Sequence, residues 1–217
     1  MPPVDDAAVA RALRASAAAL IGLAAHELSN RLAVMRETLG LIEDLARAGR
    51  AGAAGTARAQ GVLDEQVGRA LNLVRTLSGL GSALAATAED FDAGACLADL
   101  LGLAERWARQ RSLKIALEVP GTPARAGGDP ALFLCLAHRL LTRSAEPLGA
   151  GGRIAVRVAR DGGTVRVGLL PSGIRAEAGE SPDEDDRKID RELARRLGGE
   201  LQFEQGGVTT IRLAAVR

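Results

Sequence analysis

One of the two histidines in this chain stands where it could carry a phosphoryl group. His26 lies in the run His26-Glu27-Leu28-Ser29-Asn30, midway along a long stretch rich in alanine and leucine. Neutral imidazole is abundant near pH 7, and its ring nitrogen can attack phosphorus. On a helix, the spacing i, i+4 and i+7 places His26, Asn30 and Ala33 on one stripe. We therefore predict that His26 is accessible to a partner.

The residues next to His26 bear on what its imidazole could do. Glu27 is the predicted orienting or deprotonating group for the ring, although adjacent residues of a helix do not ordinarily face each other. A zinc protease site is excluded because position 30 is asparagine and not a second histidine. An ordinary solvated helix residue is the alternative to a phosphoacceptor at His26.

Composition and charge exclude several classes of protein. The 28 basic and 27 acidic side chains give a net charge of +1, which favours neither nucleic acid nor an anionic membrane. Cys96 and Cys135 have no paired-ligand spacing, so we expect neither a disulfide framework nor a zinc site, and a reducing cytoplasm fits best. The apolar stretch from Ala15 to Ala25 is too short to span a bilayer and continues into a charged helix. We predict neither a signal peptide nor a membrane anchor.

Apolar residues spaced alternately by three and four predict a helical hairpin in the first half of the chain. The expected helices cover about residues 7–48 and 56–87, with a glycine-rich turn between them. Two helices cannot cover both apolar stripes, so we predict that a second copy completes a four-helix bundle, which makes the protein a homodimer. The predicted seam comprises Ile21, Ala25, Leu28, Leu32, Met35, Leu39, Ile42 and Ala46 in the first helix, and Leu63, Val67, Ala70, Val74, Leu77, Gly81 and Leu84 in the second.

Shorter elements after Phe91 predict an α/β sandwich. Alternating apolar residues on both sides of Asp161-Gly162-Gly163 indicate a β-hairpin. We expect the helices to lie on one face of a mixed or antiparallel sheet, and the domains to comprise residues 1–89 and 90–217. The expected elements are helices near 92–111, 129–145 and 187–197, and strands near 113–119, 154–158, 165–169, 200–204 and 208–216.

From about residue 10 to 216, the chain resembles the cytoplasmic core of two-component sensor histidine kinases. It has a His-Glu-x-x-Asn box on the first helix of a hairpin, and then the Phe91-Asp92 junction, the helix start Gly128-Asp129-Pro130 and Gly198-Gly199 in the family's order. The resemblance implies an α+β fold in which an N-terminal helical hairpin forms a dimeric four-helix bundle and a histidine-kinase-like ATPase α/β sandwich follows.

The chain departs from this family at the positions that would hold nucleotide. Arg143 stands where the family has its Mg²⁺-binding asparagine, and a guanidinium cannot ligate a cation. Leu169 replaces the adenine-reading aspartate, and Pro171 the first of the glycines that follow it. The glycine-rich lid falls on Glu184-Asp185-Asp186, whose carboxylates would repel a triphosphate. We therefore predict a degenerate ATPase domain that binds neither nucleotide nor metal.

A retained phosphoacceptor beside an erased nucleotide site resembles the histidine phosphotransferases of the alphaproteobacterial ChpT type. This resemblance implies a cytoplasmic homodimer in which His26 relays a phosphoryl group between aspartates of response regulator receiver domains, downstream of a hybrid histidine kinase. The receiver would supply Mg²⁺, and Asn30 and Arg31 would contact it or neutralise charge near the phosphoryl group. Glu27, where that group commonly has aspartate, and Arg31, where it tends to a small residue or proline, depart from the pattern.

Two other functions stay open on the sequence. The first is a non-catalytic pseudokinase adaptor that binds a response regulator or a histidine kinase and controls it by occupancy. The second is a divergent active histidine kinase that uses replacement ligands for ATP. The identities of the phosphoryl donor and acceptor are not written in the sequence.

Overall fold

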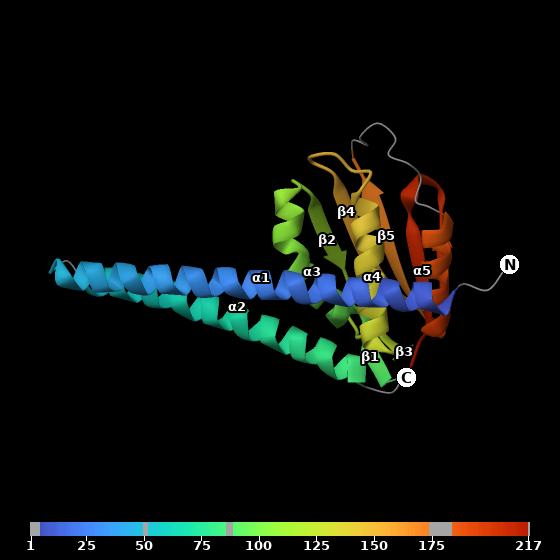
Figure 1. Ribbon diagram of the computed structural model, residues 1–217, viewed down its shortest axis with the longest axis horizontal. Coiled ribbons are helices and arrows are strands. Elements are labelled where there is room, and N and C mark those ends of the chain that lie inside the picture. Colours follow the sequence, from blue (N-terminus) through green and yellow to red (C-terminus); the bar gives the residue numbers. More distant parts are fainter. Residues whose placement is uncertain (1–4, 50–51, 86–88, 174–183, 217) are drawn as a thin grey trace. The chain divides into compact units, whose positions relative to one another are not determined.

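The computed structural model describes residues 5–49, 52–85, 89–173 and 184–216. Two long helices come first in the chain, and an α/β domain follows them (Figure 1). The predicted fold class is thereby confirmed for the single chain. Of the predicted seam residues, the surroundings of Gly81 and Leu84 lie outside what the structure describes.

Helices α1 (Asp6–Arg47) and α2 (Ala53–Ala85) are the two arms predicted from the apolar spacing. The side chain of Asp5 starts α1 by accepting a hydrogen bond of 3.0 Å from the Ala7 amide. Gly49 ends the first arm with a φ of +64°, a left-handed conformation that glycine adopts without steric cost. Both helices begin and end within about three residues of the predicted limits.

Contacts divide the chain into two compact units at points that the sequence did not predict. One unit comprises residues 21–79, and the other joins residues 1–20 to residues 80–217. Val9 and Leu20 of α1 are buried in the same apolar cluster as the core of the α/β domain. Asp6 also pairs with Arg196 at the end of α5 (Glu184–Arg196). The first turns of α1 therefore belong structurally to the α/β domain.

A five-stranded mixed sheet forms the centre of the α/β domain. Its strand order is β2-β4-β5-β7-β6, with β2 parallel to β4 and the other neighbours antiparallel. The sequence predicted a mixed or antiparallel sheet, and the sheet is mixed. Side chains alternate along each strand, so that the face with Val156, Val167 and Ile211 is buried. The strands are β2 (Lys114–Glu118), β4 (Arg153–Asp161), β5 (Thr164–Ser172), β6 (Glu200–Phe203) and β7 (Thr209–Ala214).

Three helices pack in one layer against the buried face of this sheet (Figure 1). They are α3 (Ala93–Gln110), α4 (Pro130–Ala145) and α5. Aspartates fix two of the helix starts: Asp92 accepts from the Gly94 amide at 2.9 Å, and Asp129 from the Ala131 amide at 2.8 Å. The Gly-Asp-Pro motif therefore acts as a helix cap followed by a proline in the first turn.

A two-stranded antiparallel sheet, β1 (Glu89–Asp92) with β3 (Arg125–Gly128), was not predicted. The strands are only four residues long, and β3 ends in two glycines, so neither shows an alternating apolar pattern. Gly128 has a φ of +133°, and a Cβ there would lie 3.1 Å from the Leu197 carbonyl oxygen. The pair brings Phe91 against Phe133 of α4, with ring centroids 4.8 Å apart. It therefore anchors the start of the domain to its core.

Candidate functional site

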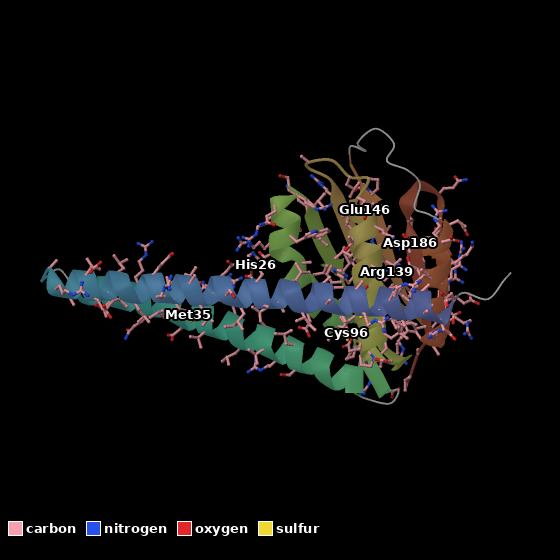
Figure 2. All side chains as sticks on the ribbon, viewed as in Figure 1. His26, Met35, Cys96, Arg139, Glu146 and Asp186 are labelled. Carbon is pink, nitrogen blue, oxygen red and sulfur yellow. The ribbon has the colours of Figure 1, made fainter. Side chains whose placement is uncertain are left out.

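His26 lies on the solvent-exposed side of α1, as predicted (Figure 2). Asn30, one turn further along, is half-buried, and its Nδ2 has no hydrogen-bond partner among the described residues. The stripe predicted from spacing thus contains an exposed imidazole and, next to it, an amide with an unused donor. A partner could reach the imidazole without any change in the fold of α1.

Glu27 and Arg31 form an ion pair with each other on α1. Both side chains are largely buried, with exposed fractions of 10% and 15%. Arg31 also donates to Oε1 of Gln66 on α2 at 3.1 Å, which ties the two helices together one turn beyond His26. The Glu27 carboxylate therefore lies on Arg31 and not on the imidazole, and its predicted role at the ring stays a prediction.

The predicted seam is only partly covered within a single chain. Five of its large apolar residues are between 45% and 55% exposed: Ile21, Leu32, Leu39, Val67 and Val74. Ala25 is exposed as well, whereas its neighbour Ala24 is fully buried. We call the apolar face that these five residues form the open seam. It lies within residues 21–79, and another protein surface could pack against it.

Two of the positions that the kinase resemblance assigns to nucleotide, Arg143 and Asp186, are joined by ion pairs between α4 and α5. Arg143 pairs with Asp190, and it also lies 2.7 Å from Oδ1 of Asp186. Arg139, one turn earlier on α4, lies 2.7 Å from Oδ1 of Asp190 and 3.3 Å from Oδ1 of Asp186. Arg139 and Asp186 are labelled in Figure 2. We call these four residues the α4–α5 ion-pair cluster.

Asp190 is the most deeply buried member of the cluster, with no exposed side-chain surface. Burial raises the pKa of Asp190 above its usual value, although the guanidinium groups of Arg139 and Arg143 lower it. Desolvation thus outweighs the attraction of the guanidinium groups, which is a common balance for a buried ion pair. The carboxylate depends on both arginines to stay charged in this position.

The remaining nucleotide-site positions lie within regular structure. Leu169 points into the core from β5 and is 2% exposed, and Pro171 pairs with Ile154 of β4 in the same sheet. The backbone of Gly152 approaches Gly173 so closely that a Cβ at Gly173 would lie 2.9 Å from the Gly152 Cα. The first turn of α5 consists of Glu184, Asp185 and Asp186. Negative side chains at this end of a helix stabilise it through their interaction with the helix dipole.

Sequence reasoning did not identify Gln66, Arg139 and Asp190. Gln66 and Arg139 carry no local signal, because each contacts a residue on another helix. Asp190 did carry one: it lies three, four and seven residues before Leu193, Ala194 and Leu197, which are buried. A carboxylate on the apolar stripe of a helix indicates a buried cation opposite it.

Among the described residues, judged by composition and by the grouping of side chains, no set meets the requirements of a metal site, and α1 alone meets those of a membrane span. In the described part of the chain, no three histidine, cysteine, aspartate or glutamate side chains are grouped so that they could hold a metal ion. By length and composition alone, α1 is apolar enough to cross a membrane, and 28% of its most apolar window is buried in the fold. The absence of a membrane anchor stays a prediction.

Comparison with known proteins relates the chain to histidine kinases at the level of fold. No protein-family model and no curated protein matches it. The catalytic domain of the histidine kinase ThkA matches with a TM-score of 0.50 and 15% identity, over 59% of this chain and 97% of that one. A second structure of that domain gives 0.50 and 20% over the same shares. Histidine kinase AdeS from Acinetobacter baumannii matches at 0.48 and 18%, over 88% of this chain and 98% of that one.

Proposed function

We propose that this chain is a phosphorelay histidine phosphotransferase. A ring nitrogen of His26 attacks the phosphorus of an aspartyl phosphate on one receiver domain, and the aspartate leaves with the electrons of the broken P–O bond. In the second step the aspartate of another receiver attacks the phosphorus. A P–O bond forms, and the P–N bond to His26 breaks with its electrons returning to the imidazole. Mg²⁺ for both steps comes from the receivers, and an upstream hybrid histidine kinase supplies the first of them.

Two observations carry the proposal together: the α4–α5 ion-pair cluster in the α/β domain, and the exposure of His26 on α1. A magnesium–triphosphate needs acceptor ligands for the cation and donor groups for the phosphates. At the corresponding positions the chain has a guanidinium, Arg143, bound to two carboxylates, Asp186 and Asp190. A guanidinium that is already paired with carboxylates cannot ligate Mg²⁺, which supports a phosphoryl group that reaches His26 from another phosphorylated protein.

Residues around His26 take supporting roles in this proposal. The Nδ2 of Asn30 is buried and has no hydrogen-bond partner among the described residues, so Asn30 can donate to a phosphoryl oxygen once its side chain turns outward. Arg31 and Glu27 hold α1 and α2 in register beyond His26 through Gln66. For Glu27 to orient or deprotonate the ring as predicted, its carboxylate must first leave Arg31.

The proposal includes a homodimer in the cytoplasm that binds receiver domains, and neither nucleic acid nor membrane. The open seam supports the dimer, since its residues carry the apolar spacing of a four-helix bundle and are half-exposed in one chain. In such a bundle two copies would cover each other's seam by the same residues, as two-fold symmetry requires. Each dimer would then carry two relay histidines.

Transfer of label from a phosphorylated receiver tests the proposal. We expect wild type to acquire acid-labile, alkali-stable phosphate, and His26→Ala to acquire none, because the nucleophile is gone. His138→Gln is the matched control, since it removes the second histidine, on α4, and should leave labelling unchanged. Receivers that bind without labelling the wild type would contradict transfer and support a non-catalytic adaptor.

Calorimetric titration with Mg-ATP tests the absence of a nucleotide site. We expect no measurable heat of binding up to about 1 mM nucleotide, which corresponds to a binding free energy weaker than about −4 kcal/mol. The reason is that the guanidinium of Arg143 is already paired with the carboxylates of Asp186 and Asp190. Saturable binding in the micromolar range would contradict this prediction and favour a divergent active kinase.

A further inference from the structure

Three polar side chains, Glu27, Arg31 and Gln66, form a charged contact between the two helices of the hairpin. The Glu27 carboxylate pairs with one terminal nitrogen of Arg31, and the other terminal nitrogen donates to Oε1 of Gln66 on α2 at 3.1 Å. Glu27 and Arg31 are largely buried, and Ala24, one turn before Glu27 on the same face of α1, is fully buried. An ion pair therefore lies on a buried face of the helix.

The stability of the hairpin alone does not explain this contact. Burying an ion pair costs desolvation energy, and apolar side chains of similar volume serve a helix contact equally well or better. The Nε of Arg31 is also buried without a hydrogen-bond partner among the described residues. A guanidinium that is incompletely bonded holds its carboxylate less firmly than a fully bonded one. The contact therefore keeps Glu27 in place and can still open.

The same contact keeps a carboxylate away from the exposed imidazole of His26 (Figure 2). When one ring nitrogen of His26 attacks phosphorus, the ring becomes positively charged and its other nitrogen keeps its proton. A carboxylate that accepts a hydrogen bond from this N–H fixes the tautomer of the ring and stabilises the charge. Glu27 is next to His26 in the sequence, but its carboxylate lies on Arg31. The ring thus lacks this support while the contact is closed.

We propose that Arg31 and Gln66 form a latch that withholds Glu27 from His26, an inference that rests on the proposed function. Gln66 is a positioning residue, because it acts on the ring only through Arg31. When Arg31 turns away, Glu27 becomes a buried carboxylate without a partner. The cost of that state drives the carboxylate outward, to water and to the imidazole beside it. Opening of the latch therefore prepares His26 to receive a phosphoryl group.

Removal of the latch should speed transfer, whereas loss of a merely structural contact would slow it or leave it unchanged. In Arg31→Met, the rate of labelling of His26 at saturating phosphorylated receiver should rise by at least about tenfold, because the charged ring is stabilised. Gln66→Leu leaves the Glu27–Arg31 pair in place and should give a smaller rise. Arg69→Met is the matched control: it breaks a half-exposed Glu–Arg pair of the same spacing on α2 and should have no effect.

The gain in rate must depend on Glu27. In Glu27→Gln combined with Arg31→Met, the rate should return to the wild-type value or below, since a neutral amide does not stabilise a charged ring as a carboxylate does. A gain that survives in this double variant would overturn the latch, and so would an Arg31→Met protein of unchanged helicity that labels no faster than wild type. If Arg31→Met loses helicity, Gln66→Leu decides the question by the same criterion.

The His26 ring reports the state of the latch without any transfer. NMR correlation of ring nitrogens with ring protons distinguishes the two tautomers of a neutral imidazole, and His138→Gln leaves His26 as the one histidine in the chain. We expect a mixture of tautomers in this parent, one predominant tautomer after Arg31→Met, and the mixture again after further Glu27→Gln. Unchanged tautomers in Arg31→Met would overturn the latch, whether or not wild type is labelled. The expected change, with no label on wild type, would support the latch and contradict the proposed transfer.

Discussion

Asp190→Ala should lower the free energy of unfolding of the α/β domain by about 3–5 kcal/mol, the usual cost of removing one partner from a buried ion pair. Asp190 is fully buried, and the side chains of Arg139 and Arg143 are 14% and 15% exposed. Without the carboxylate, both guanidinium groups lose their buried partner and keep only Asp186, which is 49% exposed. Urea denaturation followed by Trp107 fluorescence measures the loss, because the tryptophan lies in the same domain.

Two control variants distinguish loss of pairing from loss of packing. Asp186→Ala should cost less than about 1 kcal/mol, since its carboxylate is half-exposed and screened. The triple variant Arg139→Met, Arg143→Met, Asp190→Leu replaces the buried charges by apolar groups and should recover most of the stability that Asp190→Ala loses. If Asp190→Ala costs no more than Asp186→Ala, the cluster does not hold α4 against α5 as described.

Leu32→Asp combined with Val74→Asp should convert the proposed dimer to monomers. Both residues lie on the open seam, one on each helix. In a two-fold dimer each substitution occurs twice, so four carboxylates would be buried without partners. We expect the dissociation constant to rise at least a thousandfold, or about 4 kcal/mol, which analytical ultracentrifugation or light scattering over a concentration series measures.

Arg36→Asp is the control for the dimer variant. It places the same carboxylate on α1 at an exposed position whose native side chain is already charged, and it should leave the dimer intact. A protein that stays dimeric with both Leu32→Asp and Val74→Asp would show that the second copy, if bound, covers a different surface. A wild type that is monomeric at all concentrations would contradict the proposed bundle directly.

Elements that carry an apolar repeat were predictable from the sequence, and the short strands β1 and β3, which carry none, were not. The 42 residues of α1 give many turns over which the spacing is repeated, whereas the four residues of β3 give none. The same limit explains the unpredicted unit boundary. Val9 and Leu20 continue the helical pattern of α1, and nothing in that pattern says that the α/β domain covers them.

In the candidate site, too, features set by neighbouring residues were predictable from the sequence, and contacts between distant residues were not. His26 was placed on the exposed side of its helix from spacing alone, and the structure agrees. Arg143 and Asp186 were each identified by position, as two separate departures from the kinase pattern. The structure joins them directly, at 2.7 Å, and also through Arg139 and Asp190, whose contacts span 47 and 51 residues of sequence. The position of Asp190 on an apolar stripe indicates a buried cation, but which residues pair is visible only in three dimensions.

The α4–α5 ion-pair cluster also constrains the evolutionary order in which its members could have appeared. An aspartate at position 190 without either arginine would have been an uncompensated buried charge, and selection would have removed it. An arginine at position 139 or 143 could have arisen first, because its long stem lets the guanidinium reach water until a carboxylate arrives. Reversal of Arg143 alone would leave Arg139 as the remaining buried partner of Asp190. Arginine before aspartate is therefore the order of substitution in which no intermediate holds an unpaired buried charge.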